Sequence, residues 1–103
     1  LIVCSGWKGR TCIEDILLAG SLSQILLKNH GFQTDSDAVL LAKNMYNLAH
    51  QDLFSFLKNS SYRKRMNLDE DVKYCLQTNI MDIVPVWQKD TMDGGFFFSN
   101  RTI

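Results

Sequence analysis

The sequence predicts a helix-rich α/β domain with two or three β-strands, and three observations lead to this prediction. An apolar run at Leu1–Cys4 is followed by a glycine-containing loop and a helix-start signal. Apolar residues then recur at helical spacing over most of residues 13–77. Near residue 80 the spacing changes to that of a strand. Because so few strands rarely form a stable sheet alone, and the chain opens inside an apparent strand, we expect a fragment whose N-terminal half lies elsewhere.

The first predicted elements are a strand at Leu1–Cys4 and a helix over residues 13–29. Thr11 and Glu14 have the T-x-x-E spacing of a capping box, in which the two side chains hydrogen-bond to backbone amides at the helix start. Gly31 supplies a stop signal. The helical spacing predicts a broad buried face made of Ile13, Ile16, Leu17, Gly20, Leu22, Ile25 and Leu26.

Further helices and strands are predicted after residue 31. The helical stretches cover residues 36–50, 51–57, 62–66 and 69–77. A strand is predicted over residues 80–87 and a last one from Phe96, with a turn at Asp93–Gly95 between them. Three consecutive phenylalanines at residues 96–98 would point to both faces of the last strand, so we expect both faces to be covered.

The composition is that of a globular domain with no charge bias. Hydrophobic residues make up 46% of the chain, and 11 basic side chains balance 11 acidic ones. Nucleic-acid binding needs a basic excess, so we expect no nucleic-acid partner. No apolar run approaches the roughly 20 residues of a membrane helix, so we expect no membrane partner. The three cysteines have no disulfide or zinc spacing, and a cytoplasmic location is expected.

The loop at Ser5–Arg10 is the strongest candidate for a ligand site. A turn between a strand and a helix presents backbone amides to anions, and the helix start adds partial positive charge. Gly6 and Gly9 allow close approach, while Lys8 and Arg10 add full charges. The sequence therefore predicts a phosphate-type ligand here. The loop lacks the Gly-Lys-Ser/Thr ending of a P-loop, and a tight connection with surface cations is an equally open interpretation.

Glu14 and Asp15 are the candidate catalytic and metal-binding acids. Both lie in the first turn of the predicted helix, where capping and the helix dipole also favour acids, so that structural role stays open. Mg²⁺ binds one or two carboxylates together with water and phosphate oxygens, so these acids and the loop would fit one site. Asp35 and Asp37 are interpreted as helix-start acids, and Asp82 as a strand-end or edge residue.

The segment E-D-I-L-L-A-G at residues 14–20 follows the opening strand and loop, and other motifs follow it in order. These are Asp37–Ala38 with Ala42 and Tyr46, Asp52–Ser60, Leu68–Cys75 and Asp82–Val86. The ordered set resembles the C-terminal half of the 2-phosphosulfolactate phosphatase family. The resemblance implies a larger three-layer α/β/α fold and a Mg²⁺-dependent enzyme. It also implies hydrolysis of a small phosphorylated substrate, 2-phosphosulfolactate, to sulfolactate and phosphate, a step of coenzyme M biosynthesis.

The resemblance also implies roles for positions near the start of the chain. It suggests Glu14 and Asp15 as site acids, and Ser5, Gly6 and Gly9 as the phosphate-facing turn. Lys8 and Arg10 rest on the charge argument alone. The chain departs from the family pattern at Tyr62–Arg63, where a His-Gly pair is usual, and at Trp7, where a small polar residue is usual.

A second hypothesis is a non-catalytic module that binds anions or takes part in assembly. The nucleophile of a phosphatase, an aspartate or an activated water, is expected outside this part of the chain. Open strand edges could also pair with another chain, as in a homo-oligomer. Binding of phosphate without hydrolysis would favour this hypothesis over the enzyme.

Overall fold

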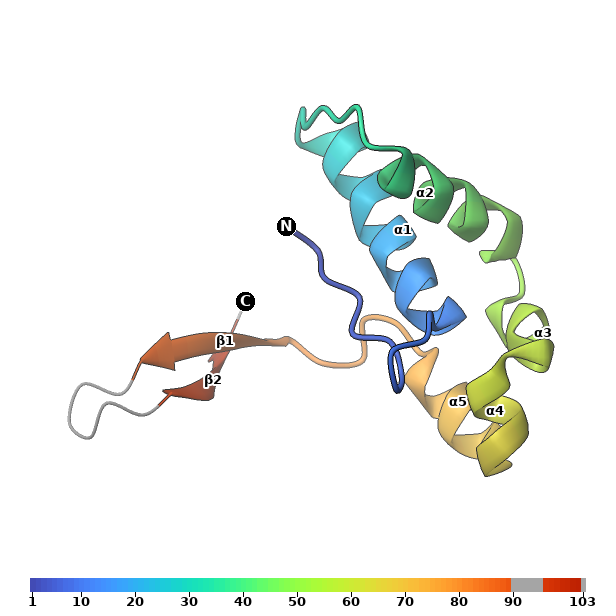
Figure 1. The fold of residues 1–103 in the computed structure, drawn as a ribbon. Coiled ribbons are helices and arrows are strands. Elements are labelled where there is room, and N and C mark those ends of the chain that lie inside the picture. Colours follow the sequence, from blue (N-terminus) through green and yellow to red (C-terminus); the bar gives the residue numbers. More distant parts are fainter. Residues whose placement is uncertain (90–95, 103) are drawn as a thin grey trace.

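A computed structural model describes residues 1–89 and 96–102 of the chain. It shows a group of helices and a β-hairpin that extends away from them (Figure 1). The elements are α1 (Ile13–Asn29), α2 (Asp37–Ala49), α3 (Leu53–Phe56), the 3₁₀ helix η1 (Leu57–Asn59), α4 (Ser61–Met66), α5 (Asp69–Cys75), β1 (Ile83–Lys89) and β2 (Phe96–Thr102). The predicted helix-rich character is confirmed, while no three-layer arrangement is present among these residues.

The prediction of a strand at Leu1–Cys4 is wrong. The segment is irregular, and the side chains of Leu1, Ile2 and Val3 are exposed. A strand is defined by the hydrogen bonds that it exchanges with a neighbouring strand. No other segment in the described part of the chain pairs with residues 1–4, so these residues lack what a strand requires.

The start of α1 also differs from the prediction. The helix begins at Ile13, and Cys12 is its N-cap residue without a side-chain cap hydrogen bond. Thr11 therefore lies one residue before the cap, so the predicted capping box of Thr11 and Glu14 is not formed. The predicted stop is confirmed, because Gly31 has the left-handed φ of 67° that glycine adopts without steric cost.

Helices α1 and α2 lie side by side (Figure 1), and Gly20 of α1 lies against the backbone of α2 at Ala42. A Cβ atom added to Gly20 would meet the backbone of Ala42 and the Cβ of Tyr46, so only glycine fits there. The core centres on Leu17, Ala49 and Leu57. Partly buried side chains pack around this centre: Ile13, Met45, Leu53, Phe56, Val72 and Leu76.

The buried face of α1 is rotated from the predicted one. Leu17 and Gly20 are buried as predicted, together with Ala19 and Ser23. Leu22 and Ile25, which were predicted to be buried, are exposed by 42% and 46%. The small residues face α2 because the two helices approach closely, and the larger apolar residues consequently point outward.

The short helices carry clear local caps. The Asp52 side chain accepts a hydrogen bond from the Ser55 backbone N–H at the start of α3, with a distance of 2.9 Å. The Ser60 hydroxyl accepts one from the Arg63 backbone N–H at the start of α4. The predicted separation of the helical stretches 51–57 and 62–66 is therefore confirmed, since Ser60 ends one helix and begins the next.

Arg63 links the three short helices. Its Nε lies 2.7 Å from Asp69 Oδ1 at the start of α5, and its Nη1 donates to the Phe54 carbonyl oxygen of α3. The guanidinium carbon also lies 3.8 Å from the centre of the Phe54 ring, within the range of a cation–π contact. The Arg63 side chain is only 10% exposed, so one nearly buried cation holds these elements together.

This link makes stability depend on pH. The hydrogen bond from Arg63 lowers the pKa of Asp69, and the Ser55 hydrogen bonds lower the pKa of Asp52. Both carboxylates therefore stabilise the folded chain above their unfolded pKa of about 4, and this contribution is lost as pH falls through the lowered folded value. We expect urea denaturation to show falling stability below about pH 4. Asp69→Asn should flatten that decrease, and a pH profile parallel to that of the parent chain would contradict the link.

Strands β1 and β2 form an antiparallel hairpin in which Ile83 pairs with Thr102 and Lys89 with Phe96. Both predicted C-terminal strands are confirmed, and Asp82 lies immediately before the first of them. The predicted turn at residues 93–95 and the coverage of the residue 96–98 side chains lie outside what the structure describes. None of the described helices is long and apolar enough to cross a membrane.

Candidate functional site

The loop predicted to hold a phosphate is a tight hairpin turn. The backbone N–H groups of Trp7 and Arg10 each donate to the carbonyl oxygen of the other residue, at 2.9 Å. The central residues Lys8 and Gly9 have φ angles of 49° and 72°, which is the pattern of a type I′ turn. Their own N–H groups lie at the tip and donate to no group in the described chain.

Asp15 ties this turn to the start of α1. The Gly6 N–H donates to Asp15 Oδ2 at 2.7 Å, across a part-buried contact. Gly6 has a φ of 64°, and a Cβ atom there would clash with the carbonyl of Arg10. The Gly6 amide, which the sequence predicted to face phosphate, therefore faces a carboxylate instead, and an anion at that amide would be repelled.

The predicted substrate-binding residues lie together on the surface before α1. Ser5, Lys8, Gly9 and Arg10 are exposed, and Gly6 is half-buried. The Lys8 ammonium lies 5.6 Å from the centre of the Trp7 ring. Lys8 and Arg10 bring two positive charges to this turn, and positive charge is what an anion requires.

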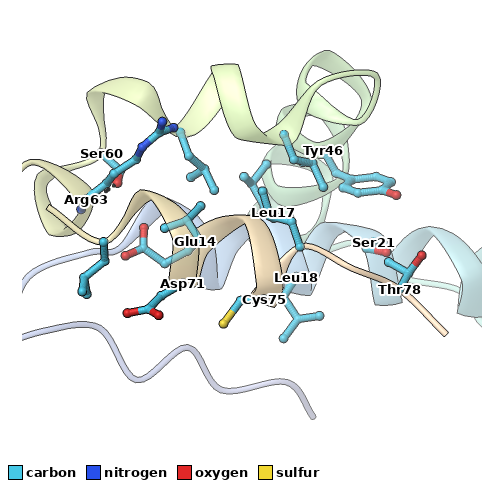
Figure 2. A pocket seen from close by; sticks show the side chains of 15 residues that line it. Glu14, Leu17, Leu18, Ser21, Tyr46, Ser60, Arg63, Asp71, Cys75 and Thr78 are labelled. Carbon is cyan, nitrogen blue, oxygen red and sulfur yellow. Dashed lines mark hydrogen bonds between the residues drawn. The ribbon is translucent and has the colours of Figure 1, made fainter. Parts of the chain in front are cut away.

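The two predicted acids diverge because neighbouring helix residues point about 100° apart. Asp15 binds the turn, whereas Glu14 lines a cavity of about 480 Å³. Figure 2 shows Glu14 and Asp71 of α5 near each other at one end of this cavity. Seven further lining residues are leucine or valine: Leu17, Leu18, Leu53, Leu57, Leu68, Val72 and Leu76.

Sequence reasoning missed Asp71 as a site residue. A signal was nevertheless available. Leu68, Val72 and Leu76 recur at i, i+4 and i+8, and this spacing marks the face of α5 that packs toward the core. Asp71 precedes the central residue of that face, so its side chain lies at the edge of the same surface.

The acids near the turn form a pair of carboxylates rather than a complete metal centre. Among the described residues, no group of three or more His, Cys, Asp or Glu side chains could hold a metal ion. One oxygen of Asp15 is already used by Gly6. Mg²⁺ binds through one or two carboxylates when phosphate oxygens and water complete its shell. Because Glu14 and Asp15 diverge, one of them would bind such an ion together with a phosphorylated ligand and water.

Comparison with known proteins identifies the family to which the chain belongs. The sequence profile of the family described as 2-phosphosulpholactate phosphatase matches residues 1–90. The chain belongs to this family, which confirms the resemblance drawn from the order of its motifs.

Curated relatives give the same result at moderate identity. A probable 2-phosphosulfolactate phosphatase from a Cyanothece strain is 38% identical over 95 residues, covering 85% of this chain and 39% of the relative. One from Gloeothece citriformis is 33% identical over 86 residues, covering 80% of this chain and 36% of the relative. The chain thus spans well under half the length of these relatives. No solved structure gives a significant match.

Proposed function

We propose that the chain is the C-terminal part of a Mg²⁺-dependent phosphatase that hydrolyses a small phosphate monoester, 2-phosphosulfolactate. The family match supports the reaction class, and the relatives of that name support the substrate. The observation that carries the proposal within this chain is the hydrogen bond from Gly6 to Asp15, which fixes a positively charged turn at the helix start.

In this proposal the turn binds the phosphoryl group at its outer side. The free tip amides and the side chains of Lys8 and Arg10 would face the phosphoryl oxygens, with the hydroxyl of Ser5 next to them. Donors fixed in place before the reaction stabilise the charge that develops on these oxygens in the transition state. Asp15 acts as a positioning residue, because its contact with Gly6 keeps the turn in one conformation.

The metal in this proposal would be held by Glu14 or by the free oxygen of Asp15, because the two side chains diverge at the start of α1. When bound, Mg²⁺ would neutralise phosphoryl charge as a Lewis acid. Without such a cation, a carboxylate beside the phosphate would repel the phosphate. The two acids and an anion-binding turn are therefore compatible only when a cation lies between the acids and the phosphate. We therefore expect phosphate to bind the chain more tightly when Mg²⁺ is present.

The rest of the proposed three-layer fold would cover surfaces that are open here. Leu18, Leu22 and Ile25 are exposed at i, i+4 and i+7 of α1, which places them on one face. The apolar residues 1–3 are exposed as well. We propose that in the full-length protein the sheet of the larger fold covers this face of α1.

Substitution of the two acids in the full-length protein tests the proposal. Glu14→Gln removes a charge and keeps the shape, and we expect turnover of 2-phosphosulfolactate to fall by about 10²- to 10³-fold. Asp15→Asn keeps an oxygen that accepts from Gly6, whereas Asp15→Ala loses the contact as well. We expect Asp15→Ala to lose more activity than Asp15→Asn.

The matched control is Asp35→Asn, which removes the same charge from an exposed acid between α1 and α2. Its turnover should equal that of the parent protein. Unchanged turnover in both Glu14→Gln and Asp15→Asn would contradict the assignment of these acids.

A non-catalytic anion-binding module is the second candidate. It is favoured by one observation, the pair of acids that stops short of a complete metal centre. Calorimetry with phosphate and Mg²⁺, combined with an assay of ester hydrolysis, separates the module from the enzyme. The module predicts a full-length protein that binds phosphate and hydrolyses no ester.

A further inference from the structure

We infer that residues 68–78 form a flap that opens and closes over the cavity between α1 and α5, and that the ion pair of Arg63 and Asp69 holds this flap closed. The flap consists of α5 and the few residues on either side of it. The inference goes beyond the proposed function and does not depend on it, because it concerns access to the cavity rather than the reaction.

The flap supplies one wall of the cavity, and α1 supplies another (Figure 2). Glu14 and Leu17 are two of the four lining residues that belong to α1. Movement of the flap away from α1 would therefore open the cavity of about 480 Å³. Six lining residues belong to the flap: Leu68, Asp71, Val72, Cys75, Leu76 and Thr78.

The flap has few buried contacts with the rest of the chain. No residue of α5 is buried, and Val72 and Leu76 are the flap residues that pack against the core. The N-cap residue Leu68 makes no side-chain cap hydrogen bond. Segments with few buried apolar contacts open at a lower free energy than the core does. We therefore expect the flap to open while α1 and α2 stay folded.

Both ends of the flap have a backbone conformation suited to a hinge. Asn67 and Asn79 flank the flap and have left-handed φ angles of 49° and 57°. Among the described residues other than glycine, only Lys8 shares a positive φ. Hinges are a few residues at the ends of elements that absorb a change in φ and ψ, and asparagine adopts both the left-handed and the ordinary conformations. The flap can thus rotate about its two ends.

One ion pair opposes this rotation. Among the described side chains, the pair of Arg63 and Asp69 is the one that joins the flap to another helix, with 2.7 Å between Nε and Oδ1. Arg63 is only 10% exposed and also donates to the Phe54 carbonyl oxygen, so its guanidinium is fixed in place. Lys73 of the flap adds a weaker contact, 5.4 Å from the centre of the Phe54 ring. These contacts hold the flap against α3 and α4.

A like-charge pair favours opening. Asp71 of the flap and Glu14 of α1 lie near each other at one end of the cavity, and two carboxylates at such positions repel (Figure 2). The flap is therefore subject to an attraction toward α4 and a repulsion from α1. The balance between the two makes the closed state dependent on the ion pair.

Thiol labelling of the full-length protein measures the opening. Leu17→Cys introduces a thiol at a cavity position that is 5% exposed, and Ala49→Cys introduces one at a core position that is 2% exposed and does not line the cavity. A polyethylene-glycol maleimide is too large for the cavity, so it reaches the thiol of Leu17→Cys only when the flap opens. Peptide mass spectrometry separates these thiols from the natural cysteines.

We expect the thiol of Leu17→Cys to be labelled faster than that of Ala49→Cys, by about tenfold or more. Dilute urea should raise the rate steeply in Ala49→Cys and little in Leu17→Cys, because global unfolding exposes more surface than movement of the flap. Equal rates with the same urea dependence would show that the cavity opens only on global unfolding, and would overturn the inference.

A second pair of variants tests the ion pair. Asp69→Asn removes the charge that Arg63 binds, whereas Glu70→Gln removes a charge whose partner, Lys73, lies within the flap itself. Labelling in Leu17→Cys should rise roughly 5- to 10-fold with Asp69→Asn and change by less than about twofold with Glu70→Gln. Equal effects of the two variants would overturn the role of the ion pair. Labelling needs no phosphate, Mg²⁺ or hydrolysis, so its outcome is independent of whether the protein is a phosphatase.

Discussion

Replacing Gly20 by alanine is expected to destabilise the chain by roughly 3 kcal/mol, the upper part of the range for overpacking a tight contact. The added Cβ would lie 2.6 Å from the carbonyl carbon of Ala42 and 2.9 Å from the Cβ of Tyr46. Because the nearest neighbour is backbone rather than the end of a flexible side chain, α1 and α2 must move apart. The free energy of unfolding in urea measures the effect.

The sign of this result is diagnostic. In an isolated helix, alanine is more favourable than glycine by about 1 kcal/mol, so helix propensity alone predicts stabilisation. Asn44→Ala on the exposed surface of α2 is the control and should change stability little. If the chain with Gly20→Ala is as stable as the parent, the two helices do not meet at this residue.

Replacing Gly6 by alanine is expected to cost more than the same change at Gly9, although both glycines have left-handed φ angles of 64° and 72°. An alanine in that conformation costs roughly 1–2 kcal/mol of stability at either position. At Gly6 the new Cβ would also clash with the carbonyl of Arg10, whereas nothing lies within 4 Å at Gly9. We expect an additional loss of about 1–3 kcal/mol at Gly6, measured by urea denaturation.

Hydrogen exchange provides a second measurement of the same pair. In Gly6→Ala, the backbone amide of residue 6 should lose its bond to Asp15 and exchange faster, while in Gly9→Ala the Gly6 amide should stay protected. Equal stability costs at the two glycines, with no change in exchange at residue 6, would show that the turn is not held against α1.

The residues of the candidate site illustrate how far sequence reasoning reached. It identified the glycines and cations of the turn and the two acids at the start of α1 from local patterns. It did not predict that Asp15 would bind Gly6, because that contact depends on how the turn folds back on the helix. It also missed that Asp71 and Glu14 line one cavity, because these two residues lie 57 positions apart in the sequence (71 minus 14).

Local features were determined by the sequence itself. Propensities and caps act within a few positions, so neighbouring residues determine where an element begins and ends. This holds for the extents of α1 and α2, the stop at Gly31, the break at Ser60 and the strand near Ile83. Only the tertiary structure decided which face of α1 is buried, that residues 1–4 are irregular, and which residues form the cavity wall. Burial and strand pairing each need a second surface, and a local pattern shows that a surface is apolar without showing what will cover it.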